Sequence, residues 1–228
     1  MDSCAQESDL PAYRKYLEET GSGGKRVPIV SLERDLGFGC NAVEAENYQG
    51  AAAAAGHLFA NGRRRILFLT GDRDWKMLSE RARGYREALE PHGLPAVVLA
   101  EEGGMSMPAG YQAIRRAIEQ GREFDAVFAA NDRMAVGAIL ALKQYGRAVP
   151  QEVSVVGFDN IDVYQLFEPA PSTVNVPKYL MGYRAAEMMI HLVEGRARTL
   201  PVVRLKTDLV VRRSSDKDAR GSLVLTGL

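Results

Sequence analysis

The stretch AVFAANDRMAVGAILALKQYGRAVPQEVSVVGFDN, residues 126–160, determines which fold this chain can adopt. Its first five residues are apolar and predict a buried strand, and residues 153–158 predict a second one. Between them, residues 132–145 have the apolar spacing of an amphipathic helix, and Gly146 can end it. A strand, a helix and a strand in this order predict two parallel strands joined by a helical crossover.

The same alternation of short apolar runs and longer amphipathic stretches extends in both directions from this segment. Strands are predicted at residues 27–32, 66–70 and 96–99, with shorter ones near 174, 202–205 and 209–212, and helices at 47–60, 79–90, 108–120 and 177–194. Continuous apolar strands separated by helices are typical of parallel sheets with helices on both faces. The sequence therefore predicts an α/β protein with doubly wound parallel sheets.

The charge balance argues against direct DNA binding by these residues. The 228 residues include 29 Lys and Arg and 29 Asp and Glu, so the formal net charge is zero. A domain that grips phosphates normally carries a basic excess. If the protein acts on nucleic acid, we expect another segment to make that contact.

The remaining bulk features predict a cytoplasmic protein that does not enter the membrane. Cys4 and Cys40 are the only cysteines and show no disulfide pattern, which fits a reducing compartment. Residues 1–20 are polar and lack the apolar core of a signal peptide. No apolar run approaches the ~18 residues needed to span a bilayer.

Polar side chains follow the predicted strands at their carboxyl ends, where open parallel sheets bind ligands. Glu33, Asn131 and Asp159 come directly after three of the strands, and Trp75 and Arg81 lie farther along after residues 66–70. Such groups suit a polyhydroxylated ligand, because hydroxyls need fixed donors and acceptors and an indole covers C–H surface. Each residue alone could instead cap a helix or be solvated in a loop, but their joint placement favours a binding site.

Signatures of catalysis and of cofactor binding are missing from the sequence. His57, His92 and His191 lack metal-ligand spacing, and no nucleophile elbow or P-loop string occurs. Residues 37–42 match G-x-G-x-x-A, but the helix expected after them begins only near Asn47, so we interpret them as a flexible loop. We predict no catalytic residue, no metal site and no cofactor.

Four ordered segments make the chain similar to a known family. They are NYQGAAAAAGHLFANGRRRILFLTG, SERARGYREALEPHGLP, FAANDRMAVGAILALKQYGRAVPQEVSVVGFDN and LVVRRSS, within residues 47–215. Residues 27–215 resemble the effector-binding module of the lactose-repressor/galactose-repressor (LacI/GalR) family of transcriptional regulators. The resemblance implies a periplasmic-binding-protein-like fold, with two doubly wound lobes and a small effector between them.

The resemblance also implies domain boundaries. Residues 1–46 with 175–206 would form the first lobe, residues 47–173 with 207–215 the second lobe, and residues 216–228 a tail. The family's N-terminal helix-turn-helix and first strand–helix units have no counterpart in the sequence. We therefore expect the first lobe to be truncated.

Carried over residue by residue, the resemblance implies a set of polar effector contacts. Arg81 would be the arginine that grips the effector, and Asn131 and Asp159 match polar contacts at the later strand ends. Glu33 stands where the family usually has an aspartate, a change that keeps the charge and lengthens the reach.

Two positions depart from the family pattern in a way that makes the site more apolar. Met105 stands where some sugar-binding members have a stacking aromatic ring, and Val176 stands where the family usually has a glutamine. Trp75 could supply a stacking face instead, or could pack on its own lobe. The identity of the effector is therefore open within the class of sugars and related polar metabolites.

The implied function is the ligand-sensing and dimerisation module of a DNA-binding transcriptional regulator. Operator DNA would be reached only through an N-terminal helix-turn-helix that these residues lack. A homodimer is expected, with the helix at 132–145 and the loop at 161–167 as the candidate interface. The alternative is a solute- or sugar-binding receptor without a DNA-binding role, which would share the fold.

Overall fold

The apolar runs of the sequence form two separate sheets. The computed structural model describes residues 28–33, 41–71, 75–101, 104–197 and 200–219, together with Pro11 and Lys15. The chain divides into unit 1, Met1–Ala45 with Lys178–Leu205, and unit 2, Glu46–Pro177 with Lys206–Leu228. We describe each unit by itself.

Unit 2 is built on a six-stranded sheet with the order β4-β3-β5-β6-β7-β9. The strands are β3 (Ile66–Gly71), β4 (Val97–Glu101), β5 (Ala126–Ala129), β6 (Ser154–Asp159), β7 (Ser172–Asn175) and β9 (Asp208–Val210). Neighbouring strands from β4 to β7 are parallel, and β9 pairs with β7 in antiparallel orientation. The predicted α/β class with parallel sheets is confirmed.

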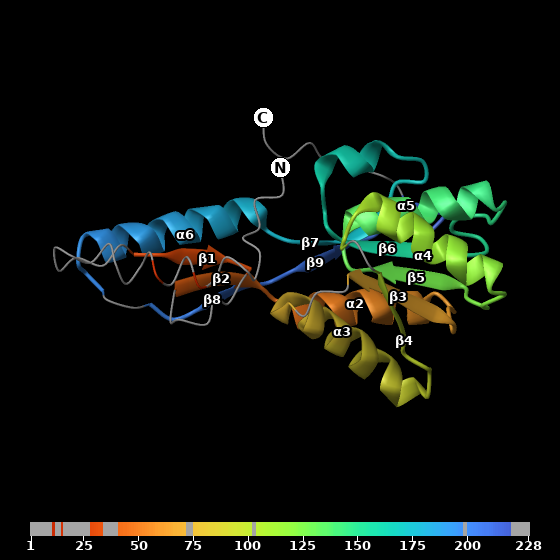
Figure 1. Cartoon of the computed structure of the whole chain (residues 1–228), viewed down its shortest axis with the longest axis horizontal. Coiled ribbons are helices and arrows are strands. Elements are labelled where there is room, and N and C mark those ends of the chain that lie inside the picture. Colours follow the sequence, from red (N-terminus) through yellow and green to blue (C-terminus); the bar gives the residue numbers. More distant parts are fainter. Residues whose placement is uncertain are drawn as a thin grey trace. The chain divides into compact units, whose positions relative to one another are not determined.

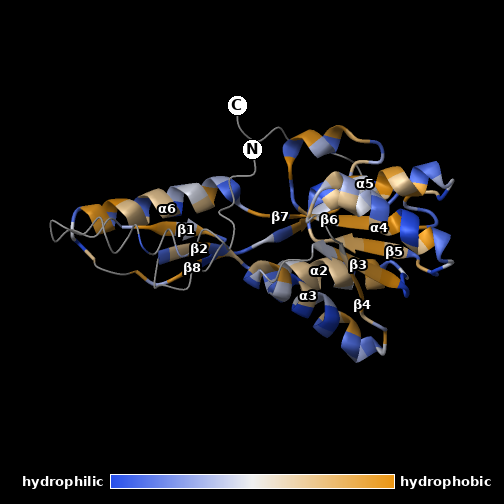
Figure 2. Cartoon of the chain, in the orientation of Figure 1, coloured by the Kyte–Doolittle hydropathy of each residue, from blue (hydrophilic) through white to orange (hydrophobic). Residues whose placement is uncertain are grey.

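Two pairs of helices cover the two faces of this sheet (Figure 1). Helices α2 (Asn47–Ala60) and α3 (Lys76–Leu89) lie on one face, and α4 (Met107–Glu119) and α5 (Asp132–Gln144) lie on the other. The strands between them are largely apolar (Figure 2). Every residue of β3 and β5 is buried. This arrangement is why the strands read as continuous apolar runs rather than as alternating ones.

A cluster of buried aromatic rings fills the space between α3 and the sheet. The Phe68 and Phe128 rings stack with their centroids 4.9 Å apart, and Tyr85 of α3 lies against both. The Tyr85 hydroxyl donates to the carbonyl oxygen of Ile66 at 2.6 Å, which satisfies its polar tip inside the core. The cluster fixes α3, and with it every residue that α3 carries toward the edge of the sheet.

In the described residues of unit 1, helix α6 (Lys178–Val193) packs on a three-stranded parallel sheet. The sheet has the order β1-β2-β8, from β1 (Val30–Leu32), β2 (Asn41–Ala45) and β8 (Val203–Leu205). Helix α6 packs on β1 and β2. Met181 and Met188 are buried on its covered side, whereas five large apolar residues are exposed: Tyr179, Leu180, Tyr183, Ile190 and Val193.

Strand β2 corrects one prediction from the sequence. Residues 37–42 were interpreted as a flexible loop, but Asn41 and Ala42 begin a fully buried strand. The strand was not recognised because it contains polar residues. The Asn41 side-chain amide donates to the carbonyl oxygen of Ile29 at 3.2 Å, and the buried Glu44 carboxylate lies 3.4 Å from the Arg204 guanidinium. Buried polar groups with hydrogen-bonding or charged partners are tolerated inside a sheet, but they leave no apolar run to recognise in the sequence.

Some predicted features lie outside the described residues. They include residue 27 of the first predicted strand, residues 37–40 of the glycine-containing segment, and the end of the tail from residue 220 onward. In the part of the chain that the structure covers, no helix combines the length and apolarity required to cross a bilayer.

Helices α4 and α5 approach closely because each places a glycine at the crossing. A methyl group added to Gly137 would overlap the carbonyl oxygen of Met107, and one added to Gly110 would overlap that of Met134. We therefore predict that Gly137→Ala lowers the free energy of unfolding by about 1–3 kcal/mol, since the helices must separate. Urea denaturation followed by circular dichroism measures this change.

Gly56 is the matched control, because it lies inside α2 with no heavy atom within 4 Å of an added methyl group. Gly56→Ala should raise the free energy of unfolding by roughly 0.5–1 kcal/mol through helix propensity alone. Equal effects of the two substitutions would contradict the close packing of α4 on α5.

Candidate functional site

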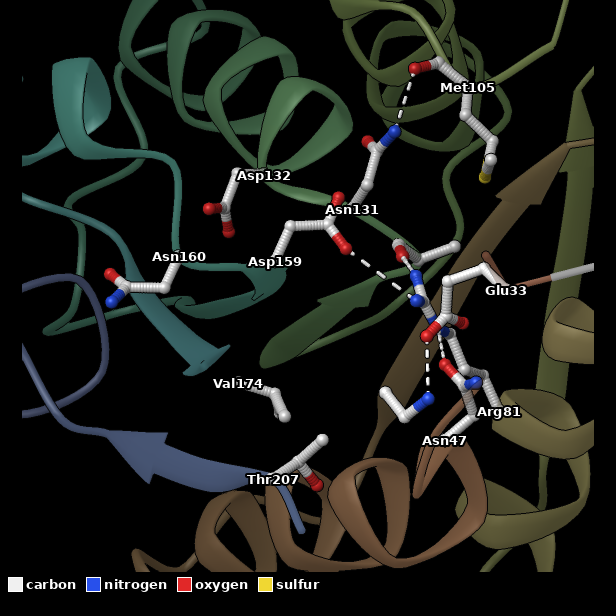
Figure 3. Close-up of polar contacts among 12 residues, drawn as sticks. Glu33, Asn47, Arg81, Met105, Asn131, Asp132, Asp159, Asn160, Val174 and Thr207 are labelled. Carbon is white, nitrogen blue, oxygen red and sulfur yellow. Dashed lines mark hydrogen bonds and ion pairs between the residues drawn. The ribbon is translucent and has the colours of Figure 1, made fainter. Parts of the chain in front are cut away.

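The candidate site lies at the carboxyl end of the unit 2 sheet. Residues from α2, α3, the end of β6 and the loop after β5 meet there, and Figure 3 shows their side chains. This edge is where ligands bind in open parallel sheets, because the loops between strands and helices leave room for them.

Arg81 is the centre of this group of side chains. Only 2% of its surface is exposed, although it is charged. Its Nε donates to the Asn47 side-chain oxygen at 2.8 Å, and one terminal nitrogen donates to the carbonyl oxygen of Ala130. The guanidinium also lies over the Phe158 ring, with its central carbon 3.6 Å from the ring centroid. These contacts hold the Arg81 guanidinium in one orientation.

Asp159 pairs with Arg81 and is partly exposed to solvent. Its Oδ1 lies 3.5 Å from the second terminal nitrogen of Arg81, and its side chain is 30% exposed, whereas that of Arg81 is 3% exposed. In Figure 3 the Asp159 carboxylate points toward Arg81. The guanidinium can donate hydrogen bonds to the hydroxyl groups of a ligand, and the accessible carboxylate can accept hydrogen bonds from them.

Asn131 has two partners inside the protein. Its side-chain oxygen accepts from the Met134 amide at 2.9 Å and so caps α5, and its side-chain nitrogen donates to the Met105 carbonyl oxygen at 2.9 Å. The structure thus gives Asn131 the capping role that was the alternative to ligand binding. Its predicted contact with an effector stays a prediction.

The three apolar and aromatic candidates of unit 2 lie in different settings. Met105 is half-buried, and its side chain packs near Gly71 at the end of β3. Trp75 is half-buried at the start of α3, and Val176 is buried just after β7. Their part in effector binding stays a prediction.

Glu33 belongs to unit 1. Its carboxylate accepts from the Ala45 amide at 2.6 Å, and its backbone has a φ of 60° at the end of β1. This contact joins the ends of two neighbouring strands. The predicted meeting of Glu33 with Arg81 around one effector stays a prediction.

Sequence reasoning did not predict the contacts by which two residues organise the site. Asn47 was predicted only as the first residue of a helix, yet its side-chain oxygen accepts a hydrogen bond from Arg81. Asp132 was read as part of a helix, but its carboxylate is buried and bonded to Ile161 and Thr173. The available signal was a polar residue at the first position of a helix that follows a buried strand.

Burial raises the pKa of Asp132 from 3.8 to about 7. The negative charge of Asp159 raises it further, while the hydrogen bonds from Thr173 and Ile161 and the positive charge of Arg212 lower it. The Asp132 carboxyl group therefore titrates near neutral pH.

Over the described ranges, no three His, Cys, Asp or Glu side chains come together as metal ligands. His57 of α2 lies 2.8 Å from the Ser215 hydroxyl, and burial lowers its pKa, so it serves as a packed polar residue.

The chain is similar in sequence to known transcriptional regulators and matches one family model. Residues 55–215 match the family model described as periplasmic binding protein-like domain. The HTH-type transcriptional regulator CelR of Thermobifida fusca is 35% identical over 216 residues, which cover 93% of this chain and 61% of that protein. The HTH-type transcriptional regulator GalR of Salmonella typhimurium (strain SL1344) is 34% identical over 194 residues, 84% of this chain and 56% of that protein.

Two solved structures have the same fold at comparable identity. The CelR–cellobiose complex has a TM-score of 0.77 at 30% identity and covers 92% of this chain and 71% of that chain. A putative LacI-family regulator from Sanguibacter keddieii DSM 10542 has a TM-score of 0.78 at 30% identity, covering 83% and 74%. The chain spans less than two thirds of the full length of the CelR and GalR regulators, 61% and 56% respectively.

The raised pKa of Asp132 predicts an unusual dependence of stability on pH. Because the folded pKa lies above the unfolded value, the stability that this group contributes is full below about pH 4 and is lost as the pH rises through about 7. Relative to Asp132→Asn, the wild type should lose about 2 kcal/mol of unfolding free energy between pH 5 and pH 8. Urea titrations of both proteins across this range measure the difference, and parallel curves would contradict it.

Proposed function

We propose that this chain, which belongs to the periplasmic binding protein-like domain family, is the effector-sensing module of a LacI-family regulator. The proposed effector is a small polar molecule. The observation that carries the proposal is the pairing of the buried Arg81 guanidinium with the partly exposed Asp159 carboxylate at the ligand-binding edge of the sheet. The chain covers only part of its relatives, so the activity of the whole regulator belongs to the proposal.

The proposed effector is a sugar or a related polyhydroxylated metabolite. Arg81 supplies fixed donors, and Asp159 supplies acceptors that are already partly desolvated. A similar regulator has been solved with cellobiose, which supports a carbohydrate as the ligand class. Met105 and Val176, in place of a ring and a glutamine, favour an effector with more apolar surface and fewer polar contacts than a typical family sugar.

The proposed output is regulation of transcription rather than catalysis. Effector binding would shift the populations of two domain arrangements, by as much as the effector's affinities for the two states differ. Operator DNA would be contacted by a helix-turn-helix outside these residues, and the protein would act in the cytoplasm. The named relatives are regulators, which supports a binding role without chemistry.

A homodimer is part of the same proposal. The 3-10 helix η3 (Asp162–Leu166) exposes Val163 and Leu166 by 56% and 68%, and Leu140 of α5 is exposed by 39%. Apolar side chains of this size on an open surface are typical of an interface between subunits.

Replacing Arg81 tests the effector site. A panel of sugars, polyols and nucleosides should contain a compound that raises the melting temperature of the wild type. Arg81→Lys keeps the charge but loses the planar fork, so the affinity for that compound should fall roughly tenfold to a hundredfold, as measured by calorimetry.

Arg86→Lys is the matched control, since Arg86 lies on the exposed side of the same helix and should leave the affinity unchanged. Unaltered binding by Arg81→Lys would show that the effector binds elsewhere. A wild type that binds no compound of the panel would count against the sugar-sensing proposal.

The dimer is tested by placing a charge in the exposed apolar surface. Leu166→Glu should shift the protein from dimer to monomer in analytical ultracentrifugation, because a buried unpaired carboxylate disfavours the interface. Tyr179→Glu, a change on the exposed face of α6, provides the comparison. A wild type that is monomeric at all concentrations would contradict the proposal.

A further inference from the structure

Asp132 is the most deeply buried carboxylate next to the proposed effector site. It is the first residue of α5, and only 1% of its surface is exposed. Its Oδ2 accepts from the Ile161 amide at 2.7 Å, and its Oδ1 accepts from the Thr173 hydroxyl at 2.5 Å. Both carboxylate oxygens are therefore used to hold other parts of the chain.

The segment that Asp132 holds has a backbone conformation that is unfavourable by itself. Asp159 has a φ of 102° and Asn160 a φ of 53°, so two consecutive residues with side chains lie in the left-handed region. Such residues persist only where the surrounding contacts determine their conformation. This turn begins at the carboxylate that faces Arg81 and ends at η3.

The contacts that determine the turn converge on Asp132 and its neighbours. The Asn160 amide donates to the Thr173 hydroxyl oxygen at 3.1 Å, and that hydroxyl in turn donates to Asp132. The Asn160 side chain donates to Asn175 at 3.1 Å and accepts from the Arg212 guanidinium at 2.7 Å. Asp132 thus anchors the turn directly at Ile161 and through Thr173 at Asn160.

Gly157 leaves room for this anchor inside the sheet. A methyl group added to Gly157 of β6 would overlap Asp132 Oδ1 and would touch the Ala135 side chain at 3.0 Å. A glycine in a buried strand commonly marks a place where another group approaches the backbone. Here that group is a carboxylate, and the strand that admits it is the one that carries Asp159.

We propose that Asp132 is a positioning residue for effector binding: it fixes the turn Asp159–Ile161 and thereby holds the Asp159 carboxylate beside Arg81. This inference rests on the proposed function, because it assigns Asp132 a part in the same site. The same anchor sets where η3 begins, so the effector site and the exposed residues Val163 and Leu166 share one support.

Hydrogen–deuterium exchange of the full chain tests the anchor without any effector. In Asp132→Ala, the amides of Asn160 and Ile161 should exchange roughly tenfold faster or more than in the wild type, beyond any change in β3 and β5. Asp132→Asn should restore most of the protection, because its side-chain oxygen can accept from Ile161 and its nitrogen can donate to Thr173.

Asp162→Asn is the control for loss of charge. Asp162 begins η3 and interacts with the Gln165 side chain and with the charge of Arg212. Its replacement should leave the amides of Asn160 and Ile161 as protected as in the wild type. Wild-type protection in Asp132→Ala, or equal acceleration in Asp162→Asn, would overturn the anchoring role.

Affinity for the compound found in the sugar and polyol panel tests the positioning role. Asp132→Ala should bind it roughly tenfold more weakly or worse, and Asp132→Asn should recover most of the affinity. Accelerated exchange without loss of affinity would overturn the inference. If no compound binds the wild type, the proposed function fails, and the exchange measurement alone decides whether Asp132 anchors the turn.

Discussion

The buried guanidinium of Arg81 is the constraint around which one end of unit 2 is built. A charge removed from water must be paired and hydrogen-bonded, or it costs several kcal/mol. Arg81 meets this requirement with groups from α2, from the end of β5 and from the end of β6. The aromatic cluster at Tyr85, one helical turn away, holds α3 in place, so that the fork reaches the edge of the sheet.

A second buried ionisable group, Asp132, supports the first. Asp132 lies at the start of α5 and fixes the turn that follows Asp159, and this turn holds the Asp159 carboxylate beside Arg81. The stability of this end of unit 2 and its proposed ability to bind an effector therefore depend on the same hydrogen bonds. An arrangement of this kind is rigid before the ligand arrives, which lowers the entropy cost of binding.

The sequence predicted the fold well where burial alone decides it. Residues 126–130 and 153–158 are apolar because helices cover both faces of their sheet, and the parallel α/β class followed from them. Strand β2 was missed because its Asn41 and Glu44 are buried with polar partners. Arg81 and Asp159 were named from strand ends and family resemblance, whereas the bonds of Asn131 to Met105 and of Asp132 to Ile161 and Thr173 join segments far apart in the sequence, and a local pattern does not specify such partners.

The most direct test of the central claim is a crystal structure of the chain with the tightest-binding compound of the sugar and polyol panel. The account predicts electron density for the compound at the carboxyl end of the unit 2 sheet, with Arg81 and Asp159 both within hydrogen-bonding distance of its hydroxyl groups. Density for the compound at any other place, with the Arg81–Asp159 pair untouched, would contradict it.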